Sequence, residues 1–165
     1  MANTEKSEQT AQEKQFAVQN IYTKDISFES PNSPHIFREQ MNLNINLQVS
    51  NNATVLAENI HEVVLSITVT AKLGEKEDAK TAYLVEIQQA GIFQITGFSQ
   101  QELGAMVGSY CPNLLFPYAR EAISSMVSKG GFPQLLLAPL NFDALYEQHL
   151  NRLKQQKDES GETTH

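Results

Sequence analysis

The sequence predicts a single α+β domain built on an antiparallel sheet. Four segments between residues 16 and 95 alternate apolar and polar side chains with the period of a strand. Residues 99–153 instead carry apolar side chains at helical spacing, and no helix separates one strand from the next. Strands that come first, followed by helices, are typical of an α+β fold with an antiparallel sheet. A length of 165 residues suits one domain.

The two ends of the chain differ from its middle. Residues 1–15 are polar and show no period, so we expect a disordered N-terminal arm. Residues 16–153 carry the periodic segments and form the predicted domain. Residues 154–165 are polar again and are expected to form a flexible C-terminal tail.

Four segments are predicted to be strands. Residues 16–29 carry apolar side chains on both faces, which predicts a central strand or a strand in an interface. Residues 43–50 and 62–72 each place apolar side chains on one face, as a half-buried strand does. Residues 81–95 form a further strand that begins with Tyr83, Val85 and Ile87 on one face. The charged loop 74–80 predicts a hairpin.

Three helical runs follow the strands. Ser99 and Glu102 have the spacing of a capping box, in which the two side chains satisfy free backbone N–H groups. Pro112 is predicted to end this first run, and Pro117 to lie in the first turn of a second run that ends near Gly130. Asn141 is predicted to cap a last amphipathic helix that runs to about residue 153.

Composition and charge exclude several function classes. The net charge of −7 disfavours a general nucleic-acid role, because phosphate backbones attract basic surfaces. A single cysteine, Cys111, rules out a disulfide within the chain and fits a reducing compartment. No signal peptide and no apolar run of membrane-spanning length is present, so the expected location is the cytoplasm, without membrane insertion.

No catalytic or metal-binding motif stands out. Cys111 has no histidine near it in sequence, so it is either a buried hydrophobic residue or a nucleophile that the fold completes. The four histidines lack the spacing of metal ligands: His35, His61, His149 and His165. Gly104 and Gly108, four apart in the first helical run, are compatible with close helix packing. These features favour binding over catalysis, with no cofactor expected.

Two surface features have alternative interpretations. Asp25 and Glu29 share a face of the first strand, and Glu86 lies mid-strand with Leu84 on its own face. These acids mark either a solvated outer sheet face or an acidic docking surface. The first strand is also rich in apolar residues, and phenylalanines are spread along the chain. They predict either one core with an oligomer interface, or exposed grooves for apolar ligands as well.

The chain resembles the SecB family of bacterial protein-export chaperones over roughly residues 16–150. The resemblance rests on blocks in one order: IYTKDISFE (21–29), PNSP (31–34), EVVL (62–65), EIQQAGIF (86–93), YCPN (110–113), LFPYARE (115–121), FPQL (132–135) and LAPLNFDAL (137–145). It implies a four-stranded antiparallel sheet with helices packed on one face, assembled as a dimer of dimers. It also implies an ATP-independent chaperone, without enzyme activity, that holds precursors of exported proteins unfolded and delivers them to the SecA motor.

The resemblance also assigns residues to two sites. The SecA-binding site would be formed by Asp25, Glu29, Leu84 and Glu86. The client-binding groove would be formed by five residues that could equally belong to the core: Ile45, Leu47, Val49, Tyr146 and Leu150. A groove for unfolded chains must accept many sequences, so it needs apolar surface rather than a specific pocket.

Two other functions compete with general export. A related chaperone dedicated to a toxin–antitoxin pair would use the same fold and groove, and the breadth of its clients would distinguish it. A small-molecule-binding or enzymatic α+β domain would need a saturable ligand and a reacting group near Cys111 or a histidine.

Overall fold

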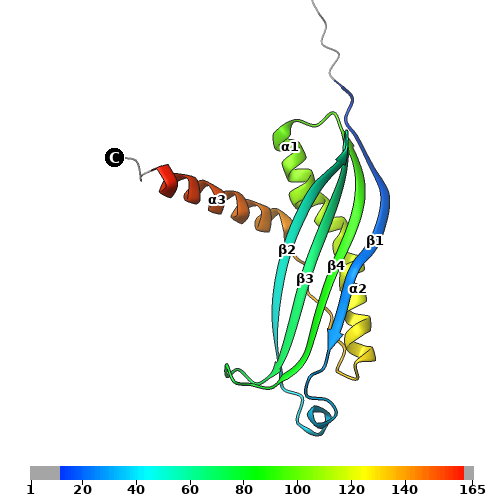
Figure 1. Cartoon of the computed structure of the whole chain (residues 1–165), viewed down its shortest axis with the longest axis vertical. Helices are drawn as coiled ribbons and strands as arrows, with labels where there is room; N and C mark the ends of the chain where they lie inside the picture. Colours follow the sequence, from blue (N-terminus) through cyan, green and yellow to red (C-terminus); the bar gives the residue numbers. More distant parts are fainter. Residues whose placement is uncertain (1–11, 162–165) are drawn as a thin grey trace, which may run out of the picture.

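A four-stranded antiparallel sheet forms the body of the molecule, as the sequence predicts (Figure 1). The computed structural model describes residues 12–161. The sheet has the order β1-β4-β3-β2, so the first two strands in sequence lie at its edges. The strands are β1 (Gln15–Glu29), β2 (Leu43–Ala57), β3 (Ile60–Leu73) and β4 (Thr81–Thr96). A short 3-10 helix, η1 (His35–Arg38), lies in the connection between β1 and β2.

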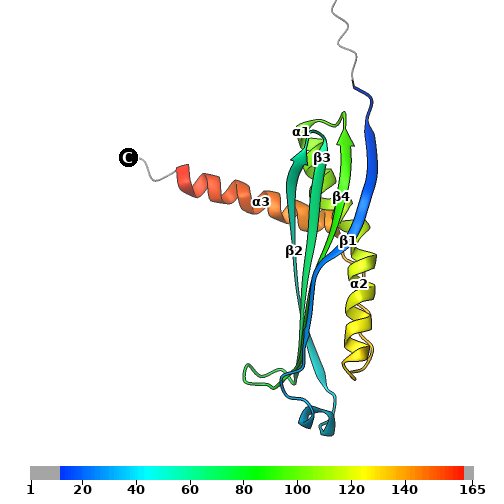
Figure 2. The same ribbon diagram turned by 45° about the vertical axis from the view of Figure 1, so that its right-hand side comes forward.

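The helices follow the sheet in the sequence. A short helix α1 (Gln100–Ala105), a π-helical turn η2 (Met106–Tyr110) and a helix α2 (Cys111–Lys129) follow one another without a break. The last helix, α3 (Phe142–Gly161), leaves the body near β2 and projects away from the sheet, as Figures 1 and 2 both show. The predicted α+β class is therefore confirmed.

One face of the sheet is buried, and we call it the inner face. Its side chains on β3 and β4 alternate with polar ones, and the register pairs Ile67 with Ile87 and Val69 with Val85. The apolar face predicted for residues 62–72 is fully buried. The opposite, outer face carries mainly polar side chains. Each large aliphatic side chain buried in this way contributes about 1.5–3 kcal/mol.

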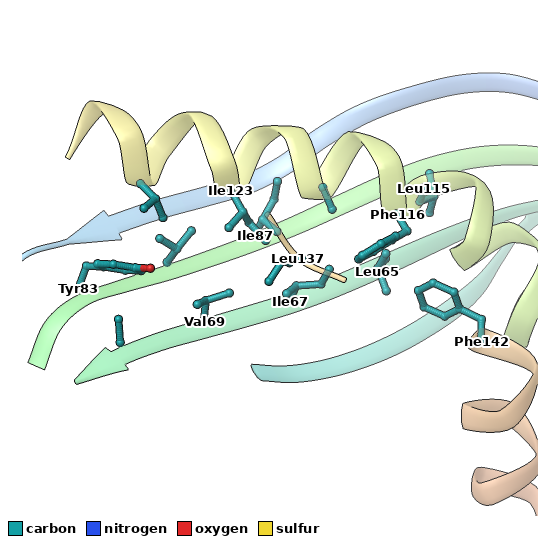
Figure 3. Close-up of a cluster of buried hydrophobic side chains, with 14 of the residues drawn as sticks. Leu65, Ile67, Val69, Tyr83, Ile87, Leu115, Phe116, Ile123, Leu137 and Phe142 are labelled. Carbon is teal, nitrogen blue, oxygen red and sulfur yellow. The ribbon is translucent and has the colours of Figure 1, made fainter. Parts of the chain in front are cut away.

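Helix α2 covers the inner face. Leu115, Ala119, Ile123 and Val127 recur every four residues, so they share one side of the helix, and all four are fully buried. Figure 3 shows Ile123 beside Ile87 of β4, with Leu137 of the following segment close by. Because α2 packs mainly over β4 and β3, the inner face of β2 stays only half-buried.

Strand β2 is longer than the sequence predicts. It continues past Ser50 to Ala57, and a tight turn at Glu58 and Asn59 leads into β3. Asn59 has a φ of 61°, a left-handed conformation that asparagine tolerates better than most residues. All side chains from 50 to 57 are exposed, so no hydrophobic alternation marks this half of the strand.

The prediction that Pro112 ends the first helical run is wrong. In η2 the Cys111 N–H donates to the Met106 carbonyl, five residues back. The next donor in that pattern would be Pro112, which has no N–H, so the Val107 carbonyl is left free. The Asn51 side chain of β2 donates to this carbonyl at 2.9 Å. Pro117 likewise lies inside α2 rather than in the first turn of a second helix.

The predicted caps are confirmed, whereas one helix end differs. Ser99 and Glu102 form the capping box, and Asn141 accepts a hydrogen bond from the Ala144 N–H at 3.0 Å. Helix α3 continues to Gly161, past the predicted end near residue 153. Residues 1–11 of the predicted arm and 162–165 of the predicted tail lie outside the described residues.

Candidate functional site: an acidic sheet face and an apolar groove

Four sequence-predicted site residues come together on the outer face of the sheet. The register of β1 with β4 pairs Glu29 with Leu84 and Asp25 with Gln88, and it places Ser27 opposite Glu86. Directly opposite residues in an antiparallel pair point to the same face. Asp25, Glu29, Leu84 and Glu86 therefore form one cluster, which we call the acidic patch.

The carboxylates of the acidic patch are exposed and are not neutralised within the described part of the chain. The three ion pairs found in residues 12–161 use other acids: Glu102 with Lys14, Glu62 with Lys24, and Glu39 with Lys80. Leu84 is half-buried and supplies an apolar side chain beside the charges. The patch has the charge and exposure needed to receive a basic segment of a partner.

An apolar groove lies between β2, η2 and the first half of α3. It encloses about 820 Å³, and we call it the apolar groove. Residues 49–53 of β2 form one wall, and Leu145, Tyr146 and Leu150 of α3 form the other. Leu145 and Leu150 are 40% and 37% exposed, so their side chains are available to a ligand.

The groove contains three of the five residues that the sequence assigned to it. Val49, Tyr146 and Leu150 line it. Ile45 and Leu47 lie on the same face of β2, but they pack against the core farther along the strand and do not line the groove. The groove lies where α3 crosses β2 near residues 49–53. A role of Ile45 and Leu47 in client binding stays a prediction.

Other lining residues were missed at the sequence level. Leu145 and Leu153 share the apolar side of α3 with Leu150, so the helical spacing could have included them. Val107, Gly104 and Gly108 line the base of the groove. The two glycines were noted only for close packing, and the tyrosine that packs on them could not be identified from spacing.

Comparison with known proteins assigns this chain to one family. The family model described as preprotein translocase subunit SecB matches residues 9–153. The protein-export protein SecB of Nitrosococcus oceani is 56% identical over 161 residues, which cover 96% of this chain and 93% of that protein. This chain belongs to the SecB family.

Other SecB proteins place the chain within the family. The protein-export protein SecB of Marinobacter nauticus is 55% identical over 148 residues, covering 90% of this chain and 86% of that protein. A SecB-like chaperone of Mycobacterium tuberculosis, solved in complex with an antitoxin peptide, has the same fold with a TM-score of 0.62. It is only 15% identical, with 76% of this chain and 90% of that chain covered. The identities favour the protein-export SecB chaperones over the toxin–antitoxin alternative.

A hydrogen-bonded cluster of Tyr22, Lys24 and Glu62 adjoins the acidic patch on the outer face of this SecB chain. The Tyr22 hydroxyl and the Lys24 ammonium both donate to the Glu62 carboxylate, the second at 2.9 Å. Desolvation and the nearby Glu62 carboxylate raise the pKa of Tyr22 to about 12. The hydrogen bonds from Tyr22 and Lys24 lower the pKa of Glu62. Lys24 is thereby engaged with Glu62.

Replacing Glu62 by glutamine is expected to cost about 1 kcal/mol of stability at neutral pH, a value that allows for the exposure of Lys24. The folded-state pKa of Glu62 is lowered, so the carboxylate stabilises the fold above its unfolded pKa of about 4.3. This contribution is lost as the pH falls through the folded-state pKa. Urea unfolding of wild type and E62Q across this range, at one protein concentration, measures it.

The matched control for E62Q is Glu39→Gln. Glu39 also pairs with a lysine, Lys80, but both side chains are well exposed, so its loss should change stability little. A stability difference between wild type and E62Q that grows as the pH falls would contradict the assigned protonation states.

The groups considered for chemistry lie apart in this SecB fold. Cys111 is fully buried, and burial raises the pKa of its thiol to about 12, so it is a packed hydrophobic residue rather than a nucleophile. No three His, Cys, Asp or Glu side chains within residues 12–161 gather as metal ligands would. In the same residues no helix has both the length and the apolar character needed to span a bilayer.

Proposed function

We propose that this SecB chain holds precursors of exported proteins unfolded, without ATP, and delivers them to SecA. The observation that carries the proposal is the apolar groove with exposed leucines on α3. An unfolded precursor presents long apolar segments, and each CH₂ buried against such a surface contributes about 0.8 kcal/mol. Polar side chains, among them Asn52 and Gln148, line the groove together with the aliphatic ones. Its aliphatic part sets few demands on sequence, which suits a general client range.

The holding function requires neither a cofactor nor a catalytic group. We propose that the chain is not an enzyme and uses no metal or nucleotide. The buried, protonated Cys111 thiol supports this proposal, since only an accessible thiolate would act as a nucleophile. The proposed location is the cytoplasm, where precursors are held before export.

The acidic patch is proposed to bind SecA. Three exposed carboxylates would receive a basic segment, with an apolar contact from Leu84 at the end of the patch beside Glu29. Charge complementarity of this kind mainly speeds association and selects the partner. Because the carboxylates are exposed, SecA binding should weaken as salt is raised. The groove and the patch lie on opposite faces of the sheet, so client and motor could be held together.

The functional form is proposed to be a homotetramer, a dimer of dimers. Strand β1 offers a free edge of 15 residues, which an open sheet tends to cover. Exposed apolar side chains also lie on α2 and in the segment after it, among them Tyr118 and Leu136 at 51% and 60% exposure. Several grooves on one assembly would add avidity for a long client. Light scattering coupled to size exclusion measures the mass directly.

Aggregation suppression tests the proposed function. A denatured precursor is diluted into buffer containing the protein, without ATP, and light scattering is followed. We expect suppression at near-stoichiometric tetramer and no binding of the folded form of the same precursor. Suppression confined to one client among several unrelated precursors would overturn the general-export proposal in favour of a dedicated chaperone, and no suppression at all would overturn the holding function.

A further inference from the structure

Helix α3 rests on two glycines of the preceding helical segment. The Tyr146 side chain packs directly over Gly104 and Gly108. A Cβ atom at Gly108 would lie 2.5 Å from Tyr146 Cδ2 and 2.6 Å from Cε2. A Cβ atom at Gly104 would instead meet only the end of the side chain, at 2.7 Å from the Tyr146 hydroxyl. The ring therefore occupies space that only glycine leaves open at position 108.

We call the contact of Tyr146 with Gly104 and Gly108 the seat of α3. Two hydrogen bonds hold the residues beside this seat in place. The buried Ser109 hydroxyl donates a hydrogen bond to the Asp143 carboxylate in the first turn of α3. On the other side of η2, the Asn51 side chain donates to the Val107 carbonyl that Pro112 leaves free. The π-helical turn η2 is thus bonded to β2 and to α3, which are the two walls of the apolar groove.

The direction of α3 depends mainly on this seat. Helix α3 packs chiefly against η2, and beyond its first turns it projects away from the sheet (Figure 2). A small rotation at Tyr146 would therefore move Leu150 and Leu153 relative to residues 49–53. That movement would change the width of the groove along its whole length.

We propose that Gly108 and Ser109 are positioning residues that orient α3 on η2 and so set the width of the client groove. The inference rests on the proposed client-holding function. Neither residue needs to contact the client strongly, because each acts through α3. The width of the groove then determines how well the apolar side chains of an extended client are enclosed.

The test compares Gly108→Ala with Gly104→Ala. Both substitutions add one methyl group to the same helical segment, where alanine favours a helix over glycine. Both added methyl groups meet the same rigid ring, but they meet it at different places. Gly108→Ala meets ring carbons close to the backbone of α3, whereas Gly104→Ala meets only the hydroxyl end, which a small rotation about χ1 moves away without moving α3. Spin labels on cysteines placed at Gln48 and Gln156, both exposed, report the distance from β2 to α3, and the buried Cys111 stays unlabelled.

The client probe is fluorescent, reduced and carboxymethylated lactalbumin, which cannot refold. For Gly108→Ala we expect a shifted label distance and about a tenfold weaker affinity, equivalent to about 1.4 kcal/mol. Gly104→Ala should keep the wild-type label distance, so its client affinity measures the effect of a methyl group in the groove base without movement of α3. In the double variant G108A/Y146A the label distance should equal that of Y146A alone, because the clash that moves α3 has been removed.

The label distance and the client affinity together test the positioning inference separately from the proposed function. A Gly108→Ala chain with an unshifted α3, or with a shifted α3 and unchanged client affinity, overturns the positioning inference and leaves the proposed function standing. A wild-type chain that fails to bind the client overturns the proposed function itself. Should Gly108→Ala not fold, Asp143→Ala takes its place, with Asp143→Asn as the control that keeps the oxygen accepting from Ser109.

Discussion

Reversing the charge of Glu86 to lysine is expected to weaken SecA binding roughly 100-fold at low salt, about 2.8 kcal/mol. Glu86 lies opposite Ser27, between Asp25 and Glu29 along β1, so a lysine there both removes one attraction and pairs internally with its acidic neighbours. The side chain is exposed, so the fold should be unaffected. Calorimetric titration of SecA into the wild type and the variant measures the change.

Two further variants separate local contact from net charge. Glu58→Lys changes the net charge by the same amount, but it lies at the β2–β3 turn. Glu86 pairs with Thr68 of β3, eight residues from the start of that strand, so the two sites are roughly 27 Å apart at about 3.4 Å per residue. Glu86→Gln removes the charge without reversing it and should have an intermediate effect. Unchanged SecA affinity in Glu86→Lys, or an equal loss in Glu58→Lys, would remove the acidic patch as the docking site.

Replacing Leu150 by aspartate is expected to weaken client binding by about 10- to 100-fold, or about 1.4–2.8 kcal/mol. Leu150 is 37% exposed in the groove wall, so much of its apolar surface is free to meet a client. An aspartate there removes that surface and must lose hydration when a client covers it. Binding of a fluorescent unfolded protein, followed by anisotropy, gives the affinity.

Leu56→Asp is the matched control for Leu150→Asp. Leu56 is 51% exposed near the β2–β3 turn and does not line the groove, so the same substitution there should leave client affinity unchanged. A comparable loss at both positions would mean that clients bind exposed leucines without regard to the groove. Both variants should keep wild-type melting temperatures, because neither side chain is in the core.

Strand faces could be predicted from the sequence because one side of this sheet is buried and the other is solvated. The alternation from Val63 to Ala71 follows directly from that asymmetry, and each inner side chain is buried. The same parity placed Asp25 and Glu29 on one face. That they lie beside Glu86 follows from the pairing of β1 with β4, which periodicity alone could not give. The resemblance grouped these residues without it.

The second half of β2 could not be predicted because none of its side chains is buried, although η2 and α3 lie beside residues 49–53. Asn51, Asn52 and Thr54 are exposed at the edge of the sheet, so there was no buried face to select apolar side chains. Their hydrogen bonds to β3 depend on the backbone, which any of these residues provides. A polar edge of this kind resists pairing with foreign strands, at the cost of a weak sequence signal.

The course of the helix at Pro112 and the position of the groove could not be predicted for a related reason: both depend on partners remote in sequence. The helix passes through Pro112 because the carbonyl left without a donor is satisfied by Asn51, 56 residues earlier than Val107. Helical spacing identified the apolar side of α3, but the point at which α3 crosses β2 depends on Tyr146 and the two glycines beneath it. That contact places Val49 in the groove and leaves Ile45 outside.

The alternation of outward-facing and inward-facing side chains along β4 limits where this gene can gain or lose codons. Leu84 and Glu86 lie on the outer face of the sheet. Val85 and Ile87, which alternate with them along the strand, are buried in the core on the inner face. Inserting or deleting one codon within this stretch would exchange the two sets, burying a carboxylate and exposing the core at once. The exposed loop 74–80 carries no such alternation. Insertions and deletions among homologous genes should therefore accumulate in that loop and be absent from the strand that follows it.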